Sequence, residues 1–265
     1  MFEIIISLVV FIFGAIIGSF LNVVVLRYQT GLSVVKGQSI CFSCSKTLCW
    51  YELVPIFSFL VQKGRCRKCL SKISWQYPAV EFISASLFLA TFWHLGGLSA
   101  IWWQLVLTLI FISLLIIIAV YDLKHKIIPD GWALSLAIIA VIYITCNFWP
   151  IIGHGSFWDW LAGPIIAAPL ALLWLVSSGR WMGLGDAKLM LGLGWFLGLS
   201  EGLSSLIMGF WLGAIYGLFI MFFGLSLFGK KITIKSEVPF APFLILGWII
   251  AYFVGLDLLH LNFLI

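Results

Sequence analysis

Charged side chains are scarce in this chain. Lys, Arg, Asp and Glu make up only 9% of its 265 residues, whereas soluble domains carry about 25%. Hydrophobic residues make up 63% and include 23 Phe and 14 Trp. This shortage of charge excludes a soluble domain and indicates a single polytopic membrane unit. A basic segment is also missing before the first apolar run, so we expect that run to remain as a spanning helix and not to be cleaved as a signal peptide.

Eight apolar stretches are long enough to cross a bilayer, which takes about 20 residues. They lie near 4–26, 78–96, 100–121, 131–149, 160–178, 184–200, 204–228 and 239–260. The sequence therefore predicts an all-α membrane protein with about eight transmembrane helices. We divide it into a first transmembrane helix at 1–26, a loop at 27–77 and a core of seven membrane helices at 78–265.

Basic residues are missing from every second loop. The loops near 97–99, 150–159 and 201–203 contain no Lys or Arg, whereas all fifteen Lys and Arg residues fall in or beside the alternate loops. Since cytoplasmic loops carry the excess of basic residues, the basic side is predicted to be cytoplasmic and both termini external. The net charge of +5 therefore reflects loop orientation and fits attraction to anionic membrane lipid. It does not indicate a nucleic-acid partner.

The only sizeable polar segment, 27–77, contains two Cys-x-x-Cys pairs. Cys41 and Cys44 form the first pair, Cys66 and Cys69 form the second, and 21 residues separate them. Two such pairs suit tetrahedral coordination of a structural zinc ion, because four thiolates leave no open position for catalysis. Disulfides are not expected on the cytoplasmic side, where thiols are kept reduced. Unliganded thiols and a redox pair remain as alternatives.

Two aspartates lie at the edges of apolar stretches, where an ionisable side chain is costly and commonly functional. Asp122 ends the third stretch, and Asp186 follows Gly183 and Gly185 at the start of the sixth. Both are predicted to lie at the cytoplasmic boundary. Two carboxylates placed together can share one proton and activate water, which is the chemistry of aspartic proteases. Helix packing is the structural alternative for the two glycines.

Several of these acids also have a structural interpretation. Asp122 taken alone is explained equally well by an ion pair with Lys124 or Lys126. Asp130, at the start of the fourth stretch, is more typical of a helix N-cap than of a catalyst. Glu81 opens the second stretch, where it either complements the helix dipole or supports a substrate site. The residues alone thus leave catalytic and structural roles open.

The motifs together resemble those of the type IV prepilin peptidases, the bacterial leader peptidases of pilins and pseudopilins (aspartic peptidase family A24). The matching segments follow the family order through nearly the whole chain: Gly18-Ser19-Phe20-Leu21-Asn22, the two cysteine pairs, Tyr77-Pro78 through Glu81, Asp122 through Asp130, Gly183 through Lys188, and Pro239 through Leu244. The short, aliphatic-rich loop is more similar to enzymes that process competence pseudopilins than to secretin-linked ones.

This resemblance implies that Asp122 and Asp186 form the catalytic pair. The enzyme would cut the basic leader of a type IV prepilin or pseudopilin at the cytoplasmic face of the bacterial cell membrane. Many members also methylate the new N-terminus with S-adenosylmethionine, an activity associated with Glu81 and the loop at 27–77. Departures from the family pattern at Phe42 and Glu52 concern that second activity alone. Supporting or substrate-binding roles are implied for Gly183, Gly185, Lys188, Lys124 and Asp130.

Two other functions compete with this interpretation. An intramembrane protease of the presenilin or signal-peptide-peptidase type also uses Tyr-Asp and Gly-x-Gly-Asp, but the double cysteine pair and the segment 239–244 argue against it. A proton-coupled transporter would use the two aspartates as relay groups. It would require polar residues deep inside several helices, and the third and seventh apolar stretches are almost wholly apolar.

Overall fold

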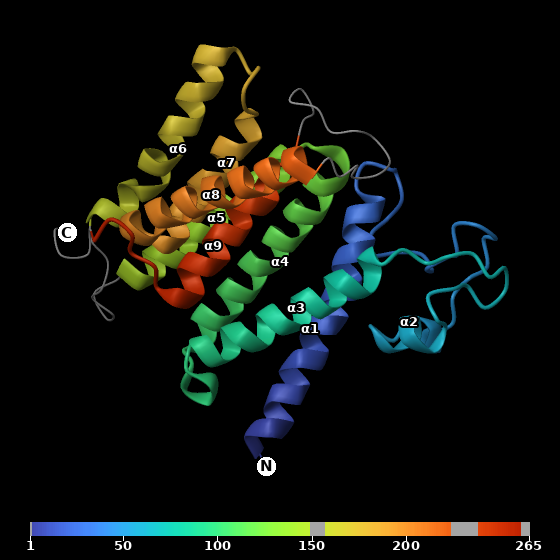
Figure 1. The fold of residues 1–265 in the computed structure, drawn as a ribbon. Helices are drawn as coiled ribbons and strands as arrows, with labels where there is room; N and C mark the ends of the chain where they lie inside the picture. Colours follow the sequence, from blue (N-terminus) through green and yellow to red (C-terminus); the bar gives the residue numbers. More distant parts are fainter. Residues whose placement is uncertain (1, 149–156, 224–237, 261–265) are drawn as a thin grey trace. The chain divides into compact units, whose positions relative to one another are not determined.

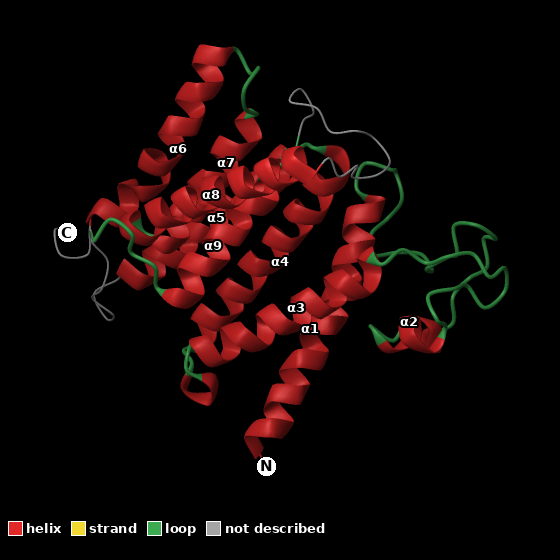
Figure 2. Cartoon of the chain, in the orientation of Figure 1, coloured by secondary structure: helices red, strands yellow, loops and turns green. Residues whose placement is uncertain are grey.

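The protein is described by a computed structural model that covers residues 2–148, 157–223 and 238–260. Within these ranges all regular structure is helical, apart from two isolated β-bridges (Figure 2). The chain forms two compact units, Met1–Ile117 and Ile118–Ile265. Each unit is described by itself below.

A helix occupies each of the eight predicted apolar stretches. These helices are α1 (Phe2–Arg27), α3 (Gln76–His94), α4 (Trp102–His125), α5 (Asp130–Phe148), α6 (Phe157–Ser177), α7 (Leu184–Leu197), α8 (Leu199–Phe223) and α9 (Ala241–Val254). The polar loop adds a short helix, and single 3-10 turns occur in two connections: α2 (Phe57–Val61), η1 (Trp50–Glu52) and η2 (Gly97–Ser99). The sequence did not predict α2.

Among the described residues, five helices are long and apolar enough to cross a membrane: α1, α4, α5, α6 and α8. The chain is therefore an all-α polytopic membrane protein. With 14 residues each, α7 and α9 extend about 21 Å at 1.5 Å per residue, less than the hydrocarbon core of about 30 Å. Eight crossings and the loop orientation stay predictions. The end of the stretch 204–228 and three of the basic residues lie outside the described residues: Lys230, Lys231 and Lys235.

The boundary between α7 and α8 differs from the sequence expectation. A loop was predicted at 201–203, but these residues belong to α8, and the break occurs at Gly198 alone. Gly198 has φ +82°, a left-handed conformation that glycine adopts without steric cost. The backbone N–H group of Leu199 then donates to Asp159 Oδ1 at 3.2 Å, which satisfies one of the unpaired donors at the start of α8.

In the first unit, α1 and α3 lie side by side with their backbones in close contact (Figure 1). A Cβ atom at Gly14 would lie 2.8 Å from the Cα of Ala85, and one at Gly18 would lie 2.8 Å from the Cα of Glu81. Only glycine fits at these two positions. The Gly-x-x-x-Gly spacing thus lets the two helices approach closely, as small residues do in membrane proteins.

The same two helices are antiparallel and stay paired over most of their length. Near one end, Trp93 Nε1 donates to Ser7 Oγ at 3.2 Å, and near the other, Asn22 Nδ2 donates to the carbonyl of Tyr77 at 3.3 Å. Although α1 is long and apolar enough to cross a membrane, its partner α3 is not among the candidate spans of the described residues. The loop at 27–77 connects the end of α1 to the start of α3 at one end of this helix pair.

In the second unit, α7 packs against α5, α6, α8 and α9 (Figure 1). A Cβ atom at Gly192 would lie 3.2 Å from the backbone nitrogen of Ala137 in α5, and one at Gly194 would lie 3.2 Å from the carbonyl oxygen of Ala162 in α6. Glycine therefore permits close approach on two sides of α7. Its large side chains fill the core between the helices, as the full burial of Leu189, Met190 and Leu193 shows.

Candidate active site and metal centre

Asp122 lies in the last turn of α4 and is only 4% exposed. Its Oδ2 accepts a hydrogen bond from the backbone N–H group of Ala241 at 3.2 Å. Ala241 is the first residue of α9, so this N–H has no partner within its own helix, and a carboxylate is favoured beside it. Among the described residues, Asp122 forms no ion pair with Lys124 or Lys126. The structure therefore offers no support for a simple boundary ion pair.

Asp186 lies in the first turn of α7, half-buried, and its carboxylate interacts electrostatically with that of Asp122. The side chain of Ile128, in the α4–α5 connection, covers Gly185, where an added Cβ would lie 3.1 Å from Ile128 Cβ. No donor hydrogen-bonds to the Asp186 side chain within the described part of the chain. The two predicted aspartates thus lie near enough for their charges to interact, and Asp186 has no hydrogen-bond donor among the described residues.

A rigid turn fixes Asp122 relative to the start of α5. The backbone N–H group of Lys126 donates to the Asp122 carbonyl at 2.8 Å, and Lys126 has φ +55°. The ring of Tyr121 stacks on His125 with centroids 4.3 Å apart and meets Trp132 edge-on at 5.1 Å. These contacts hold the end of α4 in one orientation.

The predicted supporting residues do not all gather at this site. Lys188 Nζ donates to Asp130 Oδ1 at 2.7 Å, but both side chains are largely exposed, at 41% and 77%. Lys124 is exposed as well. Glu81 belongs to the first unit. Gly183 lies close to the aspartate, since an added Cβ would be 3.8 Å from Asp186 Oδ2.

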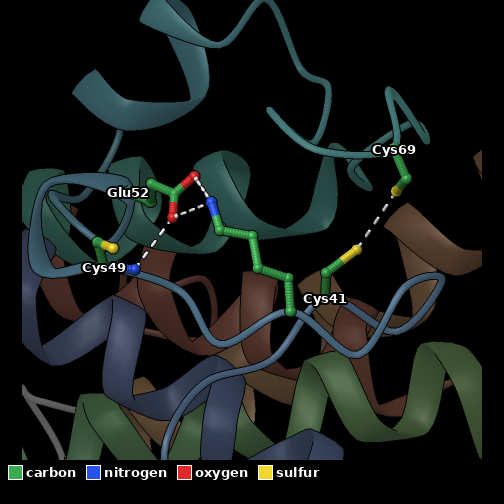
Figure 3. Close-up of polar contacts among 5 residues, drawn as sticks. Cys41, Cys49, Glu52 and Cys69 are labelled. Atoms are coloured by element: carbon green, nitrogen blue, oxygen red, sulfur yellow. Dashed lines mark hydrogen bonds and ion pairs between the residues drawn. The ribbon is translucent and has the colours of Figure 1, made fainter.

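The four cysteines of the loop converge, with all four sulfur atoms within 4.8 Å of one another. Cys41 Sγ and Cys69 Sγ are 3.8 Å apart (Figure 3). Tetrahedral zinc with Zn–S bonds of about 2.3 Å requires sulfur atoms about 3.8 Å apart. The donor set and its spacing therefore fit a closed four-thiolate site for a metal such as zinc.

The two cysteine pairs form equivalent turns. Ser45 and Leu70, which follow the second cysteine of each pair, have φ +54° and +59°. Their N–H groups donate to the carbonyls of Cys41 and Cys66 at 2.8 and 2.9 Å. An isolated antiparallel β-bridge closes each turn: Ile40–Thr47 and Arg65–Lys72. This repeated geometry presents each pair of sulfur atoms to one point.

The thiols of this cluster do not ionise alike. Backbone N–H groups of Cys44 and Ser43 lower the pKa of the Cys41 thiol from 9.0 to about 6. The pKa of the Cys44 thiol is raised to about 11: the backbone N–H group of Lys46 lowers it, but burial and the neighbouring thiols, with Cys69 first among them, outweigh that effect. Ionising all four neighbouring thiols therefore calls for a cation between them.

An ion pair between Lys46 and the buried Glu52 connects the first cysteine turn to η1. Lys46 Nζ donates to both carboxylate oxygens of Glu52, at 2.9 and 3.0 Å, and the N–H group of Cys49 donates to Oε2 at 3.0 Å (Figure 3). The Glu52 side chain is only 1% exposed. The Cys49 N–H, followed by Lys46, lowers the pKa of Glu52. The family resemblance marks Glu52 only as a departure from the family pattern and does not predict its partner.

Glu81 holds a strained turn of the loop against α3. Its Oε2 accepts the N–H group of Ile56 at 2.6 Å. Ile56 has φ +60° and ψ −53°, and the N–H of Phe57 donates to the carbonyl of Pro55 at 2.5 Å. This is a γ-turn with a left-handed central residue, a rare and strained form, here imposed on a β-branched side chain. Glu81 therefore positions the backbone that leads into α2.

A cavity of about 500 Å³ lies between α1, α3 and the loop. Its walls combine carboxylates and cations with polar and apolar groups, and they include Arg27, Lys36, Glu52, Cys66, Tyr77 and Glu81. Cavities that bind small molecules measure about 300–1,000 Å³. The first unit thus contains a ligand-sized cavity lined by Glu81 and by two of the four clustered cysteines, Cys41 and Cys66.

Two family models match the two halves of this architecture. Residues 12–95 match the Bacterial Peptidase A24 N-terminal domain, and residues 109–218 match the Type IV leader peptidase family. A relative from Bacillus subtilis (strain 168), a prepilin leader peptidase/N-methyltransferase, is 34% identical over 93% of this chain and 94% of its own length. The chain belongs to the type IV leader peptidase family. The first match contains the four cysteines and Glu81, and the second contains Asp122 and Asp186.

Two further relatives of this leader peptidase have related names. A prepilin leader peptidase/N-methyltransferase of Legionella pneumophila is 30% identical over 94% of this chain and 91% of its own length. A type 4 prepilin-like proteins leader peptide-processing enzyme of Escherichia coli O78:H11 (strain H10407 / ETEC) is 32% identical over 68% of this chain and 73% of its own length. No solved structure matches.

Sequence reasoning missed the residues that hold the two sites in place. Ala241 contacts Asp122 across 119 residues of chain, and Ile56 contacts Glu81 across 25. A signal existed for the first, because Ala241 lies in the segment 239–244 that resembles the family's C-terminal signature. Nothing in the local sequence of Ile56 signals a left-handed backbone.

Proposed function

We propose that this leader peptidase is an aspartic endopeptidase of the bacterial cell membrane that cuts the basic leader of type IV prepilins or pseudopilins at the cytoplasmic face. Asp122 and Asp186 are the catalytic pair. The observation that carries this proposal is the burial of Asp122 beside the N–H group of Ala241, with Asp186 near enough for the two charges to interact. In this proposal the core at 78–265 cleaves, and the loop at 27–77 serves a second reaction.

The division of roles follows from the surroundings of each carboxylate. Two adjacent carboxylates do not both ionise easily, so one keeps a proton. The N–H group of Ala241 stabilises negative charge on Asp122, which makes Asp122 the base that takes a proton from water. The water oxygen attacks the scissile carbonyl carbon, and protonated Asp186 donates its proton to the oxygen that develops negative charge.

The family resemblance implies a prepilin as the substrate. The positions of Asp122 and Asp186 at the ends of apolar helices suit such a substrate. Such a chain has a short basic leader followed by an apolar helix, so its cleavage point lies at the membrane boundary. Asp122 lies in the last turn of the apolar helix α4, and Asp186 in the first turn of α7. The matched leader peptidase family favours this substrate over those of presenilin-type proteases and over a transport function.

We further propose that the four cysteines hold a structural zinc ion and that the cavity of the first unit binds S-adenosylmethionine. Bound there, this cofactor would supply an electrophilic methyl group for the new N-terminus. Glu81, Arg27 and Lys36 line this cavity and would hold the cofactor by its charged groups. Several relatives carry both activities in their names, as prepilin leader peptidase/N-methyltransferases.

A cleavage assay tests the catalytic assignment. The detergent-purified full chain is incubated with a model prepilin, beside Asp122→Asn and Asp186→Asn, and the products are weighed by mass spectrometry. We expect the wild type to release the leader and both variants to leave it attached. An intact substrate with the wild type, or full cleavage by either variant, would reject the proposal. With S-adenosylmethionine added, the wild-type product should gain the mass of one methyl group.

A further inference from the structure

The short helix α2 exposes most of its apolar side chains. Phe57, Leu60 and Val61 are 64%, 63% and 52% exposed, and their i, i+3, i+4 spacing places them on one face of the helix. Trp75, just before α3, is 73% exposed and packs its ring against the buried Phe59, with centroids 4.8 Å apart. We call Phe57, Leu60, Val61 and Trp75 the α2 patch. Apolar surface of this kind marks a binding surface.

The α2 patch lies beside the C-terminal part of α1 and the N-terminal part of α3. Ile56, directly before α2, hydrogen-bonds to Glu81, which is five residues into α3 and thus about 7.5 Å along its axis. Ser58 and Phe59 line the same cavity as Ser19 of α1, two turns before that helix ends. The loop therefore folds back along the two helices, and α2 lies beside the last turns of α1 and the first turns of α3.

Cations lie directly beside these apolar side chains. A shallow groove of about 450 Å³ next to α2 is lined by Phe59, Leu60, Gly64, Ile73 and Trp75 together with three cations, Lys63, Arg65 and Lys72. Its described lining contains no carboxylate. Aromatic and apolar groups next to Lys and Arg are the combination that binds the interface of an anionic bilayer: rings sit at headgroup level, and cations contact the phosphates.

We propose that the α2 patch and its groove bind the anionic phospholipid surface of the membrane. The side chains of Phe57, Leu60 and Val61 enter the interface, and Lys63, Arg65 and Lys72 contact lipid phosphates. The bilayer is favoured over a second protein chain as occupant, because three cations line the groove beside these apolar side chains and its described lining contains no carboxylate. This contact between the α2 patch and lipid holds the cysteine loop at the bilayer that also contains the peptide substrate.

Photo-crosslinking of the full-length protein tests this proposal. The photoreactive residue p-benzoylphenylalanine replaces Phe57 or Leu60, and Leu70 serves as the matched control. Leu70 is 66% exposed but lies in the second cysteine turn and lines neither cavity. Each variant is placed in lipid nanodiscs made with and without phosphatidylglycerol, irradiated and weighed. Metal content confirms that the loop of each variant is folded.

We expect lipid adducts at positions 57 and 60, more with phosphatidylglycerol present, and at least about fivefold fewer at position 70. Replacing Lys63, Arg65 and Lys72 by Gln should remove the preference for phosphatidylglycerol, with about a fivefold loss for each cation. Adducts to a second copy of the chain or to the peptide substrate would overturn the proposal. Equal lipid labelling at position 70, or no adduct at 57 and 60, would overturn it as well.

Discussion

Four carboxylates of the molecule differ in how many groups pair with them, and the extremes are Glu52 in the first unit and Asp186 in the second. In the first unit, Glu52 and Glu81 each accept a backbone N–H group, and Glu52 also binds Lys46. In the second unit, Asp122 has one N–H donor, and Asp186 has none among the described residues. Buried polar groups that serve structure are normally paired, whereas poorly paired acids beside one another mark reactive sites. Glu52 and Glu81 therefore hold the loop in shape, whereas the lack of a donor at Asp186 among the described residues supports the proposed catalytic role of the two aspartates.

The contrast between the two sets of carboxylates would be lost if Asp122 and Asp186 had only a structural role. We expect Asp122→Asn and Asp186→Asn each to lower the cleavage rate by about 10³-fold. The double variant should be no slower than either single one, because two groups that act as one unit are not additive. Single-turnover cleavage of a model prepilin measures all three rates. An additive loss, or a single variant within tenfold of the wild type, would contradict the shared role.

Loss of a cysteine should affect the first unit and spare the second. Cys41→Ser removes one of four thiolates, so we expect the affinity for zinc to fall at least about 100-fold and methyl transfer to fail while cleavage continues. Zinc content after chelator dialysis, with product mass, provides the readout. Cys146→Ser, an exposed cysteine of α5, is the matched control and should change neither. Equal zinc content in the Cys41→Ser and wild-type proteins would rule out the metal centre.

Two substitutions of Glu81 distinguish the effect of its charge from the effect of its hydrogen bond to Ile56. Glu81→Ala leaves the N–H group of Ile56 without its acceptor, at a cost of about 1–3 kcal/mol, and releases the strained turn. Glu81→Gln keeps an acceptor oxygen and removes only the charge. We expect faster amide hydrogen exchange around Ile56 in the Ala variant and near-normal exchange in the Gln variant. Unchanged exchange in the Ala variant would show that Glu81 does not hold the turn.

The Lys46–Glu52 pair predicts a pH dependence confined to the loop. Because its partners lower the pKa of Glu52 below the ordinary 4.5, the ionised carboxylate stabilises the loop above that value. This stabilisation is lost as the pH falls through the lowered pKa. The difference in thermal unfolding between the wild type and Glu52→Gln should be constant above about pH 5 and shrink below it. If the difference in thermal unfolding between the two proteins grew as the pH fell, the ionised Glu52 carboxylate would not be stabilising the loop.

The smallest effect is expected at Lys188. Its ion pair with Asp130 is largely exposed, and such pairs contribute about 0–1 kcal/mol. Lys188→Met should therefore change the cleavage rate less than about fivefold. A loss approaching that of the aspartate variants would give Lys188 a direct role in catalysis.

Local features of the sequence predicted what depends on local chemistry. Apolar length located all eight helical regions, and cysteine spacing located four sulfur atoms that do meet. The break at Gly198 was misplaced, because one left-handed residue can separate two helices without any polar loop. The five-residue α2 was missed, since an apolar run so short has no helical period that stands out.

Contacts between residues far apart in the sequence could not be predicted, for a different reason. The neighbourhood of Asp122 and Asp186 depends on how α4, α7 and α9 pack, and no local pattern encodes the hydrogen bond from Ala241. The left-handed Ile56 is likewise imposed by Glu81 from another part of the chain. The membrane orientation inferred from Lys and Arg, and the catalytic roles themselves, stay predictions for experiment.

One measurement tests the division of labour most directly. Full-length Asp186→Asn and Cys41→Ser proteins are each given S-adenosylmethionine and two substrates, a model prepilin and a peptide that already begins at the cleaved N-terminal residue. Mass spectrometry then reads both reactions. We predict that Asp186→Asn leaves the prepilin uncut yet methylates the cleaved peptide, and that Cys41→Ser cuts the prepilin yet adds no methyl group. Cleavage by Asp186→Asn would contradict the account of this aspartate as one of the two catalytic groups.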